Sequence, residues 1–268
     1  MIRIVSILVG AFFSLALLWA FATGAYNFVS EPPKPTAEKI FHKKPKHLAL
    51  ASDGAFGKFD RQQLQRGFQV YQEVCAACHS LKHVAYRDLA ALGYNEAEIK
   101  AIAAKATVSA KDPLTGEVKD RPGMPADRFP PVTYAGLGVP PDLSLIAKAR
   151  HDGGAYVYSL LTGYQNPPAD LPKENRPGEG LHYNPYFANL NLAMPAPITA
   201  DGQVTYADGT KATVDQMSKD VSAFLVWTAE PKLEKRHQVG AWWLGFLLFA
   251  TILAYLSYRN IWAEKKGH

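Results

Sequence analysis

The chain has 268 residues, of which 48% are hydrophobic and 20% are charged, a composition typical of a folded protein rather than a disordered one. Four of its 29 basic side chains and one of its 24 acidic side chains lie in the terminal segments, which leaves 25 basic and 23 acidic residues between positions 30 and 238. This nearly neutral middle excludes the basic surface that nucleic-acid binding requires.

An uncharged run over residues 4–30 follows Arg3 at the start of the chain. The run is longer than the apolar part of a cleavable signal, which is about 7 to 15 residues, and it reaches the roughly 20 residues that span a bilayer. Ala20-Phe21-Ala22 nevertheless offers a small-x-small cleavage site. We therefore expect residues 1–30 to be a signal peptide or, as the length favours, a retained signal anchor.

Residues 31–46 are rich in proline and lysine and have neither helical nor strand periodicity. Such a composition is typical of an extended linker. We expect an extended arm over residues 31–54, followed by one exported domain over residues 55–236.

Two helices are predicted in the first half of that domain. Leu64, Phe68, Tyr71 and Val74 recur at spacings of four, three and three, which predicts a helix over 61–74 with one buried face, ending at Cys75. A second helix is expected to begin at Asn95, whose capping-box partner would be Glu98.

In the second half, residues 143–161 predict one or two helices broken at Gly153-Gly154, and residues 204–213 predict a small hairpin around Asp208-Gly209. The last helix is expected to begin at a Thr213 cap and to end before Pro231. Long proline- and glycine-rich segments over 122–141 and 167–197 are unusual for a simple helical bundle. They become reasonable if they surround a large planar cofactor.

A second uncharged run, over residues 239–258, carries aromatic residues near both ends, as membrane-spanning helices do. We expect a transmembrane helix over 237–259. Arg259, Lys265 and Lys266 follow it, so the positive-inside tendency predicts a cytoplasmic tail over 260–268 and a domain on the opposite side of the membrane.

The only two cysteines lie in Cys75-Ala76-Ala77-Cys78-His79. In this Cys-x-x-Cys-His spacing each thiol can add to one haem vinyl group while the histidine becomes an axial iron ligand. A thiol redox pair would sit at the start of a helix in a βαβ unit, and a zinc site would need two more ligands, so both alternatives are less favoured.

A sixth iron ligand could come from several side chains. Met217 lies on the apolar face of the last helix and is expected in the core. Met124 and Met194 both lie in proline-containing segments, and the prolines after Met194 favour it without excluding Met124. A bis-histidine site would draw on one of four further histidines: His83, His151, His182 and His237.

Several segments in order along residues 55–262 resemble the cytochrome c1 family, which supplies the haem c subunit of the cytochrome bc1 complex, ubiquinol:cytochrome c oxidoreductase. These segments are Gly67-Phe68-Gln69-Val70-Tyr71, Ala85-Tyr86-Arg87, Pro140-Pro141-Asp142-Leu143-Ser144, Ser159-Leu160-Leu161-Thr162-Gly163-Tyr164, Asn184-Pro185-Tyr186-Phe187, Ala193-Met194-Pro195 and the C-terminal anchor.

The resemblance implies a mainly α fold: a class I cytochrome c-like haem domain with long irregular Pro/Gly-rich loops and a small hairpin, plus a C-terminal transmembrane helix. It implies one covalently bound haem c with His79 and Met194 as iron ligands. It further implies that Arg121 reaches a haem propionate and that Tyr71, Pro140 and Pro141 line the haem pocket.

The implied function is a redox relay with no substrate bond chemistry in this chain, so no catalytic residue is expected. One electron would pass from a Rieske iron-sulfur protein to cytochrome c, within a dimeric complex that includes cytochrome b and contacts membrane lipid. A bacterial inner membrane with the haem domain in the periplasm is the expected location. The alternatives are a free-standing membrane-anchored cytochrome c that supplies an oxidase and an anchored thiol oxidoreductase.

Two segments depart from the family's pattern. Relatives often carry Asp-Tyr-Phe-Pro where this chain has Asp127-Arg128-Phe129-Pro130, and Tyr134-Ala135-Gly136-Leu137-Gly138 replaces an Asn- and Gly-rich stretch. Arg128 is therefore given no role, and local contacts with the haem are expected to differ.

Overall fold

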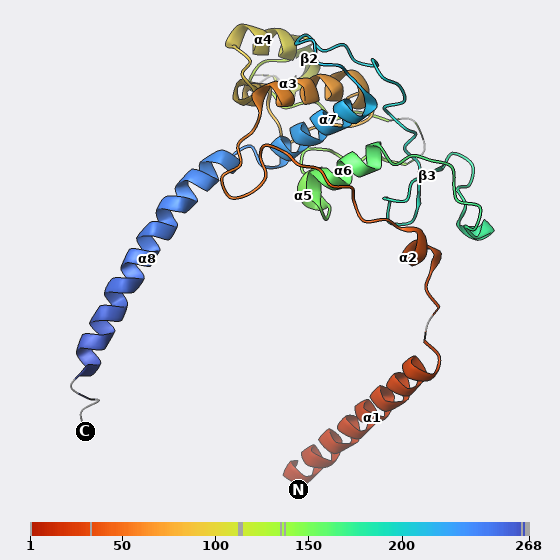
Figure 1. Ribbon diagram of the computed structural model, residues 1–268, viewed down its shortest axis with the longest axis vertical. Helices are drawn as coiled ribbons and strands as arrows, with labels where there is room; N and C mark the ends of the chain where they lie inside the picture. Colours follow the sequence, from red (N-terminus) through yellow and green to blue (C-terminus); the bar gives the residue numbers. More distant parts are fainter. Residues whose placement is uncertain are drawn as a thin grey trace. The chain divides into compact units, whose positions relative to one another are not determined.

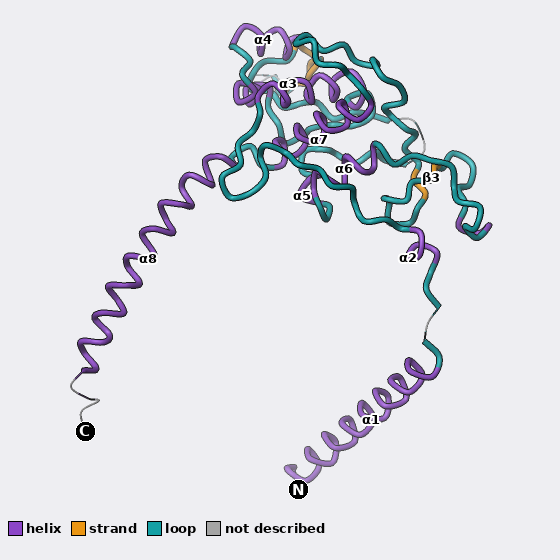
Figure 2. Tube along the Cα trace, in the orientation of Figure 1, coloured by secondary structure: helices purple, strands orange, loops and turns teal. Residues whose placement is uncertain are grey.

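The computed structural model describes residues 2–32, 34–111, 115–134, 136, 138–263 and 265. It divides into two compact units, one ending at His42 and the other beginning at Lys43. Helices and irregular loops dominate, and the described residues contain two short antiparallel ladders (Figures 1 and 2).

The α-helices are α1 (Ile2–Ser30), α2 (Ala37–Phe41), α3 (Arg61–Val70), α4 (Glu96–Ala104), α5 (Ile146–Ala149), α6 (Gly153–Leu161), α7 (Val214–Ala229) and α8 (Leu233–Ala263). A π turn, η1 (Tyr71–Cys75), and two 3-10 helices, η2 (Tyr86–Leu92) and η3 (Lys173–Asn175), join them. The strands are β1 (Thr107–Lys111), β2 (Val118–Pro122), β3 (His182–Tyr183) and β4 (Asn191–Leu192).

The first unit contains α1 and α2. α1 is long and apolar enough to cross a membrane, and the hydroxyl groups of Ser6, Thr23 and Ser30 bond back to backbone carbonyls one turn earlier. This removes the cost of placing a hydroxyl in lipid. The expected extended arm is interrupted by α2, because Thr36 caps it by accepting a hydrogen bond from the Lys39 amide.

The segment after α2 lies against the second unit's own helix α6. The Lys46 amide donates to the Ser159 hydroxyl at 2.7 Å, and its ammonium group donates to the Thr162 hydroxyl at 2.7 Å. Part of the predicted arm is therefore attached to the domain instead of extending freely.

α8 is the second helix that is long and apolar enough to span a membrane, and it begins earlier than the sequence predicts. Glu234 in its first turn accepts hydrogen bonds from the Phe59 amide at 2.8 Å and from Arg61 at 2.9 Å. These bonds join the start of α8 to the segment that leads into α3. Lys266, which the positive-inside argument used, lies outside the described residues.

The core of the second unit lies where α3 crosses α7. Gly67 faces α7 so closely that a Cβ atom there would overlap the Asp220 carbonyl oxygen and lie 2.7 Å from Phe224 Cβ. Phe68 packs on Phe224 with 5.5 Å between ring centroids, and Trp227 stacks on Phe224 with 5.7 Å between centroids. A glycine is thus needed for the helices to approach and for these aromatic side chains to bury one another.

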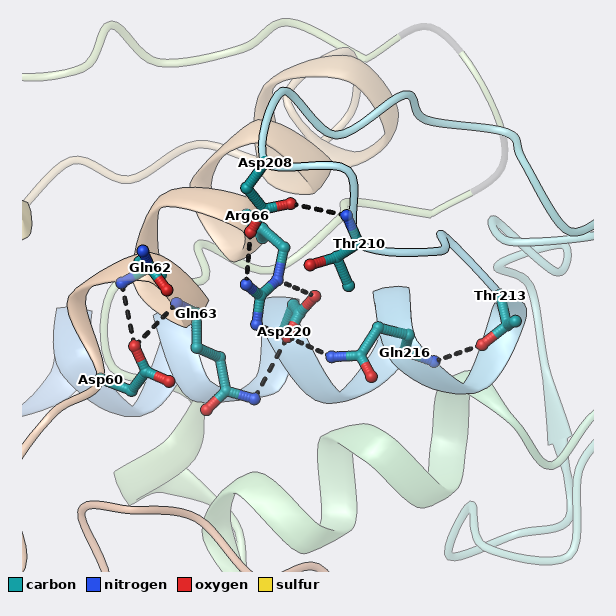
Figure 3. A network of polar contacts seen from close by, with 9 residues as sticks. All are labelled: Asp60, Gln62, Gln63, Arg66, Asp208, Thr210, Thr213, Gln216 and Asp220. Carbon is teal, nitrogen blue, oxygen red and sulfur yellow. Dashed lines mark hydrogen bonds and ion pairs between the residues drawn. The ribbon is translucent and has the colours of Figure 1, made fainter.

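A network of hydrogen bonds and ion pairs joins α3 and α7 beside the aromatic core (Figure 3). The fully buried Asp220 carboxylate pairs with Arg66 at 2.9 Å and also accepts hydrogen bonds from the amide groups of Gln63 and Gln216. Arg66 also pairs with Asp208 at 2.7 Å. Although burial opposes the charge, these two carboxylates raise the pKa of the Arg66 guanidinium, which stays charged. A buried carboxylate is tolerated here because its hydrogen-bonding capacity is satisfied.

The helix starts follow the capping signals of the sequence. The Asn95 side chain accepts from the Glu98 amide while the Glu98 carboxylate accepts from the Asn95 amide, as the predicted capping box requires. Thr213 accepts from the Gln216 amide at 3.1 Å, as predicted, but the Gln216 side chain points to Asp220 instead of closing a box.

Residues 143–161 form two helices, α5 and α6, as one of the two predicted arrangements. The break lies over residues 150–152, where Asp152 adopts a left-handed φ of 62°, and the two glycines are the first residues of α6. Gly154 is buried, and a Cβ atom there would meet a Val226 methyl group of α7 at 2.8 Å. Gly154 therefore allows α6 to pack closely on α7.

The hairpin predicted over residues 204–213 is wrong in position. No strand occurs in that described segment, because Val204 and Tyr206 are buried and Asp208 is used by Arg66 and by the Thr210 amide. The segment still turns back on itself, since the Gly202 amide donates to the Ala212 carbonyl at 2.7 Å, but its residues form no strand ladder. The longer antiparallel hairpin is β1–β2, in which Thr107 faces Pro122 and Lys111 faces Val118.

Candidate functional site

A cavity of about 500 Å³ opens in the second unit, and its wall is mainly apolar. This volume lies within the range of pockets that hold a cofactor-sized ligand. The wall is formed by Val74, Cys75, Cys78, His79, Tyr134, Gly138, Val139, Pro140, Pro141, Leu143, Ile146, Arg150, Tyr156, Val157, Leu160, Leu161, Phe187, Leu192, Ala193, Met194, Pro195, Pro197, Val221 and Leu225. Six of the eight site residues named from the sequence are in this set.

The two cysteines and the histidine reach the wall from the end of the first helix. α3 widens into the π turn η1, in which the Ala76 amide donates to the Tyr71 carbonyl, and the His79 amide then donates to the Cys75 carbonyl at 2.9 Å. π turns occur frequently at functional sites. This tight turn brings Cys75, Cys78 and His79 to one cavity.

The ring of His79 is oriented by the Pro140-Pro141 segment. His79 Nδ1 lies 2.8 Å from the Pro141 carbonyl oxygen. A carbonyl can only accept, so Nδ1 carries the proton and Nε2 keeps a free lone pair. This is how proteins prepare a histidine to bind a metal through Nε2.

Hydrogen bonds made by Asp142 and Leu143 hold the Pro140-Pro141 segment against residues 80–82, which follow His79. The Asp142 carboxylate accepts from the Lys82 amide at 2.8 Å, and the Leu143 amide donates to the Ser80 carbonyl at 2.9 Å. Burial alone would raise the pKa of Asp142, but the Lys82 and Ser144 hydrogen bonds lower it overall. The acceptor for His79 is therefore held in place by bonds between residues 142–143 and residues 80–82.

Met194 also lies in this wall, on the segment that follows β4. Met124 does not line it and is half exposed, and Met217 is fully buried in the core, as its place on the apolar face of α7 predicts. His83, His151, His182 and His237 are likewise outside the cavity wall. Of the sulfur and imidazole candidates for a second axial ligand, only Met194 shares the described cavity with His79.

Tyr71 and Arg121 are the two site residues that the structure does not bring to the wall. Tyr71 is buried behind it, where its hydroxyl donates to the His79 carbonyl at 2.9 Å and its ring packs on Phe224. Arg121 forms a two-pronged pair with Asp127, at 2.6 Å and 2.9 Å, and this pair lowers the pKa of Asp127.

Arg128, at one of the two departures from the family's pattern, makes a 3.4 Å hydrogen bond to the Lys82 carbonyl and forms an isolated bridge with Ala85. Its guanidinium is not part of the cavity wall. At the second departure, Ala135 and Leu137 lie outside the described residues.

Sequence reasoning gave no site role to several polar residues around the cavity. Tyr134, Arg150 and Tyr156 line the wall, and Tyr164 donates a hydrogen bond to the Met194 carbonyl at 3.0 Å. Nothing in the sequence near Arg150 distinguishes it from a surface arginine. Tyr164 lies in a family-like segment, but its contact depends on a loop 30 residues away.

The chemistry of the cysteines does not suit a thiol redox centre. Burial raises the pKa of the Cys75 thiol to about 12, whereas catalytic cysteines have lowered values that favour the thiolate. No group of three His, Cys, Asp or Glu side chains suited to a metal ion occurs in the described part of the chain. The donor set instead combines two thiols, one imidazole with a free nitrogen and one thioether around an apolar cavity, which fits a covalently bound haem.

Comparison with known proteins agrees with this donor set. A model of the Cytochrome C1 family matches residues 50–265. A mitochondrial protein of Arabidopsis thaliana named "Cytochrome c1 1, heme protein, mitochondrial" is 43% identical over 264 residues, covering 95% of this chain and 83% of that protein.

Two bacterial proteins are similarly related. Cytochrome c1 of Rhodospirillum rubrum is 42% identical and covers 80% of this chain and 85% of its own length. A protein of Bradyrhizobium diazoefficiens named "Cytochrome b/c1" is 41% identical over 82% of this chain, which spans 36% of that longer protein.

Proposed function

Because this chain belongs to the cytochrome c1 family, we propose that it carries one covalently bound haem c and serves as the electron-transfer subunit of a respiratory cytochrome bc1 complex. The observation that carries the proposal is the single apolar cavity whose wall includes Cys75, Cys78, His79 and Met194.

Each cysteine has one task in this proposal. Cys75 and Cys78 would each add through sulfur to one carbon of a haem vinyl group, with the thiol proton passing to the other carbon, which would give two thioether links. His79 would supply Nε2 to the iron, and the Pro141 carbonyl would hold its ring in the required tautomer. Met194 would supply the thioether ligand. The haem would provide one-electron redox chemistry, at a potential that thioether ligation raises.

The remaining wall residues exclude water and bind the haem edge. Pro140 and Pro141 form part of the apolar wall, and Tyr71 supports it from behind through the His79 carbonyl. Two arginines are candidates for a haem propionate. Arg121 would have to share its guanidinium with Asp127, whereas Arg150 already lies in the wall. We therefore favour Arg150 and retain Arg121 as the partner that the family resemblance implies.

In the complex, this chain would receive an electron from a Rieske iron-sulfur protein and pass it to cytochrome c. Cytochrome b and membrane lipid would surround α8, in a dimeric assembly within a bacterial inner membrane. Arg259 and Lys265 after the apolar part of α8 support a cytoplasmic C-terminus and a periplasmic haem domain.

A pull-down in mild detergent tests the assembly. Full-length chain with an affinity tag should bring down cytochrome b and a Rieske protein in amounts comparable to its own. Recovery of haem-bearing chain without either partner, from membranes that contain both, would instead support a free-standing cytochrome c that supplies an oxidase.

Thiol labelling tests the covalent link. After treatment with a disulfide reductant, the unfolded chain should not react with maleimide at Cys75 or Cys78, because a thioether sulfur is not released by that reductant, and the band should stain for haem after denaturing electrophoresis. A Cys78→Ala variant is the control, since it keeps at most one link and should stain weakly. Two reactive thiols in the parent chain would support the thiol oxidoreductase instead.

A further inference from the structure

One hydrogen bond connects the end of α6 to the segment that carries Met194. Tyr164 Oη donates to the Met194 carbonyl oxygen at 3.0 Å. The Tyr164 side chain is half-buried. Within the described residues, the backbone of Met194 makes no other hydrogen bond. The position of this carbonyl therefore depends strongly on Tyr164.

The glycine before Tyr164, Gly163, allows the end of α6 to lie close to residues 184–186. A Cβ atom at Gly163 would collide with the Tyr186 ring and lie 2.8 Å from the Asn184 side-chain oxygen. Only a glycine lets the turn at residues 184–186 press against the end of α6. That contact brings the segment leading to Met194 beside the residue that follows Gly163.

The turn is then fixed to α6 by a fully buried asparagine. Asn184 donates through its side chain to the Leu160 carbonyl at 2.8 Å and through its backbone amide to the Leu190 carbonyl at 2.7 Å. Leu190 is fully buried with a left-handed φ of 67°, a costly conformation for a branched side chain. The structure therefore holds residues 184–190 in one defined path, four residues before Met194.

We propose that Tyr164 is a positioning residue for the axial thioether: its hydroxyl holds the Met194 carbonyl and so favours the sulfur over competing ligands at the iron. The inference rests on the proposed function, in which Met194 is an iron ligand. Asn184 fixes the approach of the chain to Met194, and Tyr164 fixes the ligand residue itself.

The expected effect follows from the strength of one hydrogen bond. For an added ligand such as imidazole to replace the thioether, the Met194 segment must move and release the Tyr164 bond. Without the bond, the displaced state becomes easier to reach by the factor that one ordinary hydrogen bond contributes, about twofold to tenfold. The apparent affinity of the ferric haem for imidazole should rise by the same factor, and the reduction potential should fall.

The test is imidazole titration of the ferric form of the purified full-length complex carrying Tyr164→Phe. We expect intact covalent haem, imidazole binding tighter by about twofold to tenfold, and a lower potential. Tyr94→Phe is the matched control, because Tyr94 is half-buried like Tyr164 but lies outside the cavity wall, and its imidazole affinity should equal that of the parent. An equal affinity in the Tyr164→Phe variant would overturn the proposal.

A second variant covers the case in which Tyr164→Phe does not accumulate. Placing 3-fluorotyrosine at position 164 makes the hydroxyl a stronger donor, so imidazole should bind more weakly, and unchanged or tighter binding would contradict the proposal. Failure of the proposed function is separable, because replacing Met194 itself would then leave the potential and the haem spectrum unchanged.

Discussion

A Met194→Leu variant is expected to keep its covalent haem, to lose the iron–thioether absorption band and to fall steeply in reduction potential. Leucine fills a similar volume but cannot donate a lone pair to the iron, while the links through Cys75 and Cys78 are untouched. Axial ligands set haem potentials over a range of roughly 0.8 V, so the fall should be a substantial part of that range. Optical spectroscopy of the oxidised protein and a redox titration measure the two effects.

Two methionine replacements serve as controls. Met124→Leu changes a half-exposed side chain outside the cavity, and Met217→Leu makes a similar exchange in the buried core. Both should retain the absorption band and the parent potential. If Met194→Leu also retained both, or if Met124→Leu lost them, the assignment of the axial ligand would be wrong.

Gly67→Ala is expected to destabilise the haem domain by about 3 kcal/mol or more. The added methyl group would overlap the Asp220 backbone and Phe224, neither of which can move without separating α3 from α7. Separation would also stretch the Arg66–Asp220 pair and leave a buried carboxylate poorly satisfied. A lower yield of haem-bearing chain and a lower thermal midpoint in detergent are the expected readouts.

Gly178→Ala is the matched control, because that glycine is exposed and has no atom within 4 Å of the added methyl group. It should change stability little, or increase it slightly by restricting the unfolded chain. Equal thermal midpoints for the two alanine variants would show that the helix crossing does not require a glycine at position 67.

Features that depend on neighbours in sequence could be predicted well. The caps at Asn95 and Thr213 are local hydrogen bonds between residues three positions apart, and the structure confirms both. The apolar periodicity of residues 61–74 likewise predicts the helix that ends at the cysteine pair. These signals depend on residues within one or two helical turns of each other, so they can be recognised without knowing the tertiary structure.

Features that depend on distant partners could not be read in the same way. Met124 and Met194 have similar local sequences, and only the path of residues 184–192 places one of them in the cavity with His79. Asp220 is a charged residue on the buried face of α7. Its burial is explained by the ion pair with Arg66 of α3, which lies far away in the sequence.

The misplaced hairpin has the same origin. The turn signalled by Asp208-Gly209 does form, with Gly209 at a φ of 76° and its amide donating to the Tyr206 carbonyl, but the flanking residues form no strands, because Arg66 binds the Asp208 carboxylate and Tyr206 is buried in the core. Long-range ion pairs and burial thus determined this segment, and neither is visible in local propensity.

The most direct test of a haem c subunit within a cytochrome bc1 complex is a redox-titrated optical spectrum of the complex purified in mild detergent through this chain. We expect haem c, assigned to this chain by haem staining of its denatured band, together with haem b in the same preparation. A preparation with haem c alone would contradict membership in a cytochrome bc1 complex, and one without haem c would contradict the site at Cys75, Cys78 and His79.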